Sequence, residues 1–273
     1  MIGAIIGDAA GSTFEFSCIK TRDIPLFAPG SEITDDSLLS IAIANAFLLT
    51  MDNRDALQQT IVTEMRSIGR AYPYPMGGYG GNFFRWLMGS DTRPYGSQGN
   101  GSAMRVSACG DIAQSLDEAL ALAKLSAEVT HSHPEGVRGA QATAAAIYLA
   151  KTGATQEEIR AYINEHFYAL TETCDKIRAW YDFDGTCQGT VPQAITAFLE
   201  STSFEDALRT AISLGGDADT LTDITCAIAW PFYARRGPDK VMQRLFAEAM
   251  AMIPDELRDI VIEWEERYGV YDA

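Results

Sequence analysis

Basic residues are scarce in this chain. Its 273 residues include 21 Lys and Arg against 37 Asp and Glu, which gives a net charge of −16. Nucleic acids and anionic membrane surfaces bind basic patches, and no cluster of Lys and Arg exists here to form one. We therefore expect no nucleic-acid partner and no membrane partner. The excess of carboxylates instead suits solubility or the binding of cations.

Cysteines are few, and long apolar runs are missing. The five cysteines are odd in number and show no C-x-x-C spacing, which favours small buried thiols in a reducing compartment over a disulfide framework. The first segment, MIGAIIGDAAG, is apolar, but it has no basic residue and Asp8 interrupts it. It therefore predicts neither a signal peptide nor a membrane span. We expect a cytoplasmic protein that acts as a monomer.

Alternating strand patterns are also missing, as are linkers and repeats of fixed length. Apolar residues instead recur at three-to-four spacing, which is typical of helices. We therefore predict a single all-α domain over residues 1–273. Two long loops, 15–33 and 71–101, interrupt the helices, and loops of that length in a compact protein are usually functional. Helices are predicted over 36–50, 54–70, 82–89, 102–114, 115–130, 135–153, 155–166, 173–181, 189–200, 204–214, 219–235, 238–250 and 255–268.

Two helix starts carry clusters of acids with a threonine. Thr34, Asp35 and Asp36 precede one helix, and Asp217, Asp219 and Thr220 open another. Each cluster alone is compatible with an N-cap and its acidic first turn. Neither cluster contains a Lys or Arg, however, and acids at an apolar helix end repel each other unless a cation joins them. Oxygen ligands select Mg²⁺, Mn²⁺ or Ca²⁺, and several carboxylates suffice for two such ions.

The first segment has an acid among small residues. Asp8 lies in a predicted apolar helix that also contains Gly3, Gly7 and Gly11. The small residues allow close approach, either of a second helix with Asp8 bonding a backbone amide, or of a ligand. Both interpretations stay open. Glu15, at the start of the first long loop, is unremarkable on its own.

A glycine-rich loop and a histidine pair follow. YGSQGNGSAMR (95–105) runs into a predicted helix start, which in principle binds an anion through free backbone N–H groups. It lacks the lysine of a Walker A motif and the spacing of G-x-G-x-x-G. In THSHPEG, His131 and His133 could act as ligands, bases or substrate contacts, or His133 could cap a helix that Pro134 opens. The chain has no G-x-S-x-G motif, so nothing indicates covalent catalysis by a serine.

Taken in order, GDAAGSTFE, TDDS, GYGG, GSQGNGSAMR, THSHP and GGDADT resemble the ADP-ribosylglycohydrolase family, from residue 3 to about residue 234. That family includes the dinitrogenase reductase-activating glycohydrolases and the animal ADP-ribosyl hydrolases. The resemblance implies a compact all-α fold of orthogonally packed helices, with two Mg²⁺ or Mn²⁺ ions in a cleft. It also implies an enzyme that hydrolyses the glycosidic bond between ADP-ribose and an acceptor, such as an arginine side chain or a small molecule.

The resemblance also implies roles for individual residues. Glu15 matches the acid on a mobile flap and is the favoured catalytic base, with Asp35 and Asp36 as alternatives. Gln98 stands where some relatives have an aromatic residue against adenine, so Tyr95, Tyr79 and Phe84 are the candidates for that contact. Ala218, between the last two aspartates, departs harmlessly from the usual Thr or Val. The matching metal ligands are Thr34, Asp35, Asp36, Asp217, Asp219 and Thr220, and the substrate contacts are Gly96, Ser97, Gln98, Gly99, Asn100, Gly101 and His131.

Three other functions are compatible with parts of this pattern. A non-catalytic structural relative is disfavoured, because Glu15 and all the matching aspartates are retained. A metal-dependent phosphohydrolase could use the same carboxylates. A hydrolase of the same family could act on a metabolite such as O-acetyl-ADP-ribose instead of a modified protein.

Overall fold

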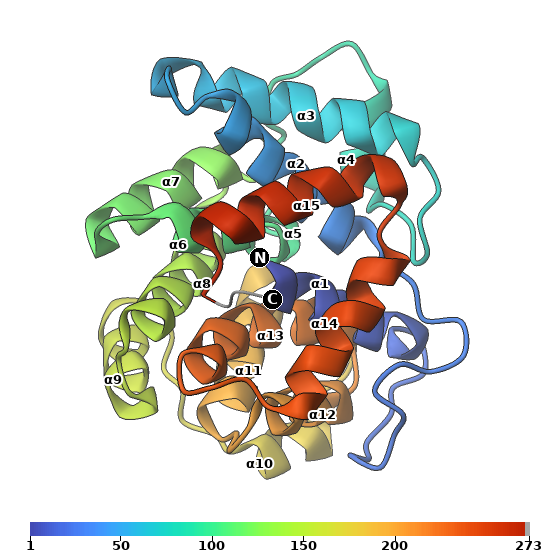
Figure 1. The fold of residues 1–273 in the computed structure, drawn as a ribbon, viewed down its shortest axis with the longest axis vertical. Coiled ribbons are helices and arrows are strands. Elements are labelled where there is room, and N and C mark those ends of the chain that lie inside the picture. Colours follow the sequence, from blue (N-terminus) through green and yellow to red (C-terminus); the bar gives the residue numbers. More distant parts are fainter. Residues whose placement is uncertain (271–273) are drawn as a thin grey trace.

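A computed structural model describes residues 1–270, and over that range the chain forms helices and no β-strand beyond two isolated bridges (Figure 1). This confirms the all-α prediction. None of the helices in the described range is long and apolar enough to cross a membrane. The helices are α1 (Ile2–Gly11), α2 (Asp35–Leu49), α3 (Leu57–Ala71), α4 (Gly81–Met88), α5 (Gly101–Met104), α6 (Ser107–Ile112), α7 (Leu116–Glu128), α8 (Pro134–Thr152), α9 (Gln156–His166), α10 (Cys174–Trp180), α11 (Cys187–Leu199), α12 (Phe204–Leu214), α13 (Ala218–Ala234), α14 (Lys240–Met252) and α15 (Asp255–Tyr268), with 3-10 helices η1 (Ser12–Phe14) and η2 (Arg54–Ala56).

Most predicted helices match observed ones to within a few residues, but one prediction is wrong. The segment 102–114 is two short helices, α5 and α6, instead of one. The break falls at Arg105, whose backbone leaves the helical region and whose guanidinium donates a 2.9 Å hydrogen bond back to the Gly101 carbonyl oxygen. The chain thus turns where this long side chain enters the interior, which apolar spacing alone does not reveal.

Helix α13 lies at the centre of the molecule. Every residue of α13 except Tyr233 is buried, as expected for a helix that is apolar on all sides. Figure 1 shows α13 near the middle of the fold, with α11, α12 and α14 around it. The buried apolar side chains of the described residues join into one core. The acids at the start of α13 therefore begin inside the protein.

Helix α1 packs against α13 with almost no side-chain volume between the two backbones. A Cβ atom added at Gly7 would lie only 2.2 Å from the Thr222 carbonyl oxygen, so no larger residue fits there. The contacts run in opposite directions along the two helices, which makes them antiparallel. The facing pairs are Gly3 with Cys226, Gly7 with Thr222 and Gly11 with Ala218.

This antiparallel packing explains why Glu15 meets the acids at the start of α13. Gly11, at the end of α1, faces Ala218, at the start of α13. The chain continues from Gly11 through η1 to Glu15, which brings Glu15 to the start of α13, where Asp217 and Asp219 lie. The glycines of the first segment thus serve a helix–helix contact, one of the two interpretations left open by the sequence.

Candidate active site

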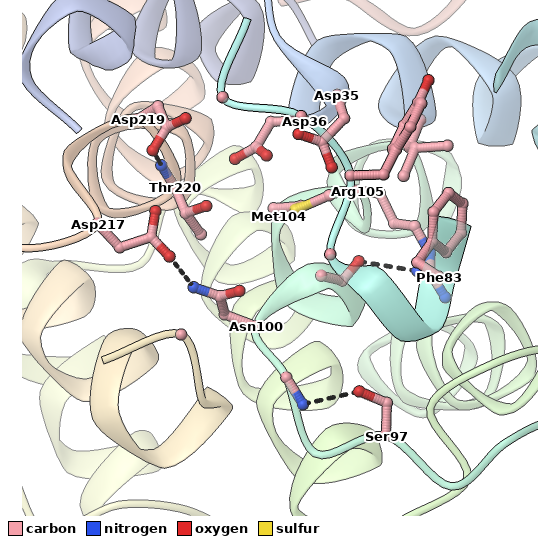
Figure 2. A pocket seen from close by; sticks show the side chains of 18 of the residues that line it. Asp35, Asp36, Phe83, Ser97, Asn100, Met104, Arg105, Asp217, Asp219 and Thr220 are labelled. Carbon is pink, nitrogen blue, oxygen red and sulfur yellow. Dashed lines mark hydrogen bonds between the residues drawn. The ribbon is translucent and has the colours of Figure 1, made fainter. Parts of the chain in front are cut away.

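One cleft collects most of the residues singled out in the sequence. It has a cavity volume of about 460 Å³ and is lined by segments far apart in the chain. In Figure 2, Asp35 and Asp36 enter from α2, Asp217, Asp219 and Thr220 from the start of α13, and Ser97 and Asn100 from the glycine-rich loop. The lining also includes Glu15 and Phe16 after η1, residues 77–83, Arg105, His131, Phe183 and Gly185.

Three carboxylates converge at one end of the cleft. Single oxygens of Glu15, Asp217 and Asp219 lie within 4.8 Å of one another. Asp217 and Asp219 are buried, and Glu15 is half-buried with its Oε2 atom enclosed and without a hydrogen-bond partner. Burial, followed by the charges of Asp217 and Asp8, raises the pKa of Glu15 to about 7. A group of this kind can hold a metal ion.

The aspartates of α2 face the same end of the cleft. Asp36 is 2% exposed, and its Oδ2 has no hydrogen-bond partner. Burial raises the pKa of Asp36 well above its ordinary value, and the charges of Asp219 and Asp35 raise it further. Burial likewise raises the pKa of Asp35 and of Asp219 well above the ordinary value, and the charges of neighbouring acids, such as Asp217, raise both further. The acids of α2 and those at the start of α13 therefore raise one another's pKa.

Asp8 organises the start of α2 from behind this cluster. Its Oδ2 accepts hydrogen bonds from the backbone N–H of Thr34 (2.9 Å) and of Ser37 (3.1 Å), and also from the Ser37 hydroxyl. Its Oδ1 accepts from the Thr34 hydroxyl at 2.7 Å. A buried carboxylate thus meets the free N–H groups of a helix start, which explains an acid inside an apolar helix.

Thr34 and Thr220 differ in their surroundings. The Thr34 Oγ1 atom donates to Asp8 and accepts a 3.2 Å hydrogen bond from the Asp36 N–H, so Thr34 caps α2 and does not line the cleft. Thr220 does line the cleft, and its N–H donates to the Asp219 Oδ1 atom at 2.9 Å. Asp217 occupies the N-cap position of α13 but makes no capping hydrogen bond.

The acidic end of the cleft fits a hard divalent cation. Within residues 1–270, none of Glu15, Asp35, Asp36, Asp217 and Asp219 forms an ion pair with a basic side chain. Enclosed carboxylate oxygens without partners remain on Glu15 and Asp36. Charges this close and this buried cannot all ionise unless a cation compensates them. The donors are all oxygen atoms, the set preferred by Mg²⁺, Mn²⁺ and Ca²⁺.

The glycine-rich loop also lines the cleft and is bonded to one of the acids. The Asn100 side-chain amide donates to the Asp217 Oδ2 atom at 2.7 Å (Figure 2). It also donates to the Thr190 hydroxyl at 3.0 Å. The backbone of the loop pairs with residues 185–187, through Asn100 N–H to Gly185 and Cys187 N–H to Gln98, each at 2.9 Å. Sequence reasoning missed the 183–187 segment, because its residues carry no local signal of a site.

Beneath this loop lies a buried positive charge. Arg105 is fully buried and donates to the Gly101 and Ser126 carbonyls and to the Thr130 hydroxyl. Burial lowers the pKa of its guanidinium to about 10, so it stays charged at neutral pH. Sequence reasoning named no role for Arg105, although it ends the GSQGNGSAMR motif. Helix α5 has only four residues, so the positive field at the loop comes mainly from this side chain, and less from a helix dipole.

His131 lies beside Arg105 and the glycine-rich loop, and its side chain is neutral. It is 4% exposed, and burial, followed by the charge of Arg105, lowers the pKa of its imidazole well below its ordinary value. The Thr130 hydroxyl accepts a hydrogen bond from Arg105 and lies 2.7 Å from His131 Nδ1. The Nε2 atom, on the other side of the ring, would lie 3.3 Å from a Cβ atom at Gly101.

Other expected contacts divide between the cleft and the surface. Ser97, Gly99, Asn100, Gly101 and His131 line the cleft, whereas Gly96 and Gln98 are exposed outside it. Of the aromatic candidates, Tyr95 and Tyr79 line the cleft. Phe84 instead packs against Tyr74, and its neighbour Phe83 lines the cleft.

His133 and Asp223 lie outside the cleft. The His133 Nδ1 accepts a 3.1 Å hydrogen bond from the Glu135 N–H, so His133 is the N-cap of α8. Asp223 is fully buried, and neither of its carboxylate oxygens has a hydrogen-bond partner. Burial, followed by the charge of Asp8, raises the pKa of Asp223 well above its ordinary value.

The cleft thus combines clustered acids with a buried cation under a glycine-rich loop. The chain also matches a known protein family. Residues 1–253 match the model of the ADP-ribosylglycohydrolase family. The chain belongs to this family. As a member it is an ADP-ribosyl glycohydrolase, an enzyme that cleaves a glycosidic bond to ADP-ribose.

Individual relatives agree with the family match. The ADP-ribosylarginine hydrolase Tri1 of Pseudomonas putida is 25% identical, over 95% of this chain and 76% of that protein. The ADP-ribosylhydrolase ARH3 of Homo sapiens is 25% identical, over 88% of this chain and 85% of that protein. A solved structure titled ADP-ribosylglycohydrolase-related protein complex is similar in fold, with a TM-score of 0.64 and 21% identity over 92% of this chain and 95% of that one.

Proposed function

We propose that this glycohydrolase releases ADP-ribose from ADP-ribosylated arginine side chains in a reaction that depends on divalent cations. The observation that carries the proposal is the convergence of Glu15, Asp217 and Asp219 within 4.8 Å, in a cleft that the loop above Arg105 also lines. A substrate with a ribose at one end and a pyrophosphate beside it matches these two parts of the cleft. An arginine acceptor is supported by the name of one relative, the ADP-ribosylarginine hydrolase Tri1.

Two Mg²⁺ or Mn²⁺ ions are the proposed cofactors. The proposed ligands from α13 are Asp217, Asp219 and Thr220, and those from α2 are Asp35, Asp36 and Thr34. Cations held here would compensate the carboxylate charges, orient the ribose hydroxyls and lower the pKa of a bound water. Thr34 is the weakest member of the set, because its hydroxyl already bonds Asp8.

Glu15 is the proposed general base. The reaction joins a water oxygen to the anomeric carbon, breaks the bond from that carbon to the guanidine nitrogen, and passes through an oxocarbenium-like state. The Glu15 carboxylate would accept the proton of the water, and the departing guanidine would take up a proton in its place. Glu15 follows η1 at the start of a long loop, so it can reach the substrate from the open side of the cleft. Asp35 and Asp36 are the alternative bases.

The part of the cleft at the glycine-rich loop would hold the pyrophosphate. Residues 96–101 of the loop and His131 would contact its oxygens, while the Arg105 charge beneath the loop compensates them. Tyr95 and Tyr79 are the proposed aromatic contacts of the adenine, since both line the cleft. We further propose that residues 1–273 form a single-domain monomer that works in the cytoplasm without a nucleic-acid partner.

A set of ADP-ribosylated substrates tests the proposal. The purified protein is given ADP-ribosyl-arginine, ADP-ribosyl-serine peptide and O-acetyl-ADP-ribose, with EDTA, Mg²⁺ or Mn²⁺, and free ADP-ribose and phosphate are measured. We expect ADP-ribose from the arginine substrate with metal and none with EDTA. Preference for O-acetyl-ADP-ribose would support the metabolite hydrolase instead, and release of phosphate would support the phosphohydrolase. Undiminished turnover in EDTA would refute cation dependence.

A further inference from the structure

The segment that carries Glu15 has few ties to the rest of the protein through its backbone. In the described structure the backbone hydrogen bond of residues 15–20 outside regular helices is local, from Ser17 N–H to the Phe14 carbonyl at 3.0 Å. The segment has no helix of its own beyond η1, and its next residues are mostly exposed. The position of the Glu15 carboxylate therefore depends on the side chains of this segment, among them Ile19, which packs against the hydrophobic core.

Three alternate side chains reach a single neighbouring segment. Phe16 stacks on Phe183 with ring centroids 6.3 Å apart and an interplanar angle of 16°. The Cys18 Sγ lies 3.8 Å from an Asp182 carboxylate oxygen. The third, Lys20, donates from its Nζ to the Tyr181 carbonyl oxygen at 2.5 Å. The residue numbers of the contacts rise from 16 to 20 in one segment and fall from 183 to 181 in the other. The two segments therefore run antiparallel to each other.

Lys20 makes the one strong contact of the three. Its Nζ also donates to the carbonyl oxygen of Leu214. Tyr181 is the C-cap of α10 and Leu214 is the last residue of α12, so the ammonium group meets two helix C-termini. Carbonyls at a helix C-terminus lack helical partners and carry the negative end of the dipole, which suits a cation. Phe16 and Phe183 remain 75% and 52% exposed, so their stacking buries little apolar surface.

The same lysine lies over the turn that delivers the other acids. Gly215 has φ +75°, and a Cβ atom there would lie 3.0 Å from Lys20 Nζ. This glycine follows Leu214 and begins the turn to Asp217. The Glu15 carboxylate itself lies against Gly77, where a Cβ atom would approach its Oε2 to 2.4 Å. Lys20 therefore joins the Glu15 segment to the 214–217 turn, where the Cys18 Sγ would also lie 3.1 Å from a Cβ atom at Gly215.

We propose that Lys20 is a positioning residue, which fastens the Glu15 segment to the ends of α10 and α12 and so holds the Glu15 carboxylate beside Asp217 and Asp219. The inference rests on the proposed function only for its effect on turnover. Loss of the ammonium leaves both helix ends without their partner and releases the segment, which moves Glu15 away from the acids. Lys20 does not line the cleft, so it acts through Glu15 and not on the substrate.

The chain contains a matched control. Lys151 also donates from one Nζ to two backbone carbonyls, those of Asp111 (2.5 Å) and Tyr268 (2.7 Å), and neither lies in the cleft. Lys20→Met and Lys151→Met each remove an ammonium group that bridges two carbonyls while keeping most of the side-chain volume. Lys20→Arg retains the charge and several N–H donors. A loss that follows Lys20→Met alone, and that Lys20→Arg largely restores, identifies the role of the charge at this position.

The first measurement reports the segment without using activity. A nitroxide is attached at Ser17→Cys in a Cys18→Ser background, where the four remaining native cysteines are buried. We expect Lys20→Met to convert an immobilised spectrum into a mobile one, because the segment detaches, while Lys151→Met leaves the spectrum unchanged. Identical spectra for Lys20→Met and its parent would overturn the inference. This result holds whether or not the protein hydrolyses any ADP-ribosylated substrate, so it separates the two proposals.

The second measurement is a double-mutant cycle on turnover of ADP-ribosyl-arginine. We expect Lys20→Met to lower kcat by about tenfold to a hundredfold with a smaller change in KM, and Lys20→Arg to recover most of the loss. In a Glu15→Gln background, Lys20→Met should cause no further loss, because the group it positions is already gone. A full additional loss in that background would show that Lys20 does not act through Glu15. Wild-type protein inactive on every acceptor would refute the proposed function alone.

Discussion

The Asn100 side chain donates a 2.7 Å hydrogen bond to Asp217, a residue 117 positions further along the chain. This bond joins the glycine-rich loop to the acid cluster, so the position of the loop and the position of the acids depend on each other. Since Asp217 makes no capping bond to its own helix, Asn100 is the partner that sets the direction of its carboxylate.

Replacing Asn100 should therefore damage the metal centre. We expect Asn100→Ala to lower divalent-cation affinity and kcat/KM by about tenfold to a hundredfold, the usual effect of losing a group that orients a ligand. Calorimetric titration with Mn²⁺ measures the cation affinity, and steady-state kinetics measure kcat/KM. Asn45→Ala is the matched control, because Asn45 donates to Glu64 at the same 2.7 Å between α2 and α3, away from the cleft. Equal effects of both variants would show that the bond to Asp217 has no special role.

Removing one acid should stabilise the protein without metal and weaken its response to metal. Asp36→Asn retains the shape of a buried side chain whose ionisation is opposed by burial, Asp219 and Asp35. In EDTA we expect a gain of about 1 kcal/mol, or a rise in Tm of about 2–4 °C. Added Mg²⁺ should raise the Tm of wild type more than that of the variant. Thermal unfolding of wild type and Asp36→Asn measures this difference, with the exposed Asp117→Asn as control. A lower Tm of Asp36→Asn than of wild type in EDTA would contradict the prediction.

Acid should destabilise the protein through His131. Burial lowers its pKa below the ordinary 6.5, so below that pH the unfolded chain binds a proton that the folded protein does not. Stability from this group is full above 6.5 and falls with pH below it, by at most about 1.4 kcal/mol per unit. Urea unfolding of wild type and His131→Gln at pH 7.5 and 5.5 measures the difference, with the exposed His166→Gln as control. A His131→Gln variant that loses as much stability as wild type would refute the prediction.

Arg105 should matter for phosphate-containing ligands and little for the nucleoside alone. Because its guanidinium is charged and buried beneath the loop, Arg105→Met should weaken ADP-ribose binding by about tenfold or more. Adenosine has no phosphate, so its weaker binding should change little. Calorimetric titrations of both ligands, after circular dichroism has verified the fold, test this. Equal losses for the two ligands would mean that Arg105 supports the cleft as a whole.

Much of the architecture follows from local patterns. Apolar spacing at three to four residues places most helices correctly, and threonines such as Thr155 and Thr173 cap the helices that follow them. The acids at Asp36 and Asp217 are visible because each cluster lacks a basic neighbour. Two features needed the tertiary structure: the break at Arg105, and the pairing of the loop with residues 185–187. Both arise from contacts between segments far apart in the chain, which no local window contains.

The sequence by itself determined the all-α class, the helix starts that carry the acids and the family, since each depends on residue types at short spacing. Only the tertiary structure decided that Glu15 meets Asp217 and Asp219, because that meeting depends on the backbone contact of α1 with α13. It also decided that Thr34 faces Asp8 and that Lys20 joins two helix ends, since a side chain takes its partner from whatever segment the fold brings within reach.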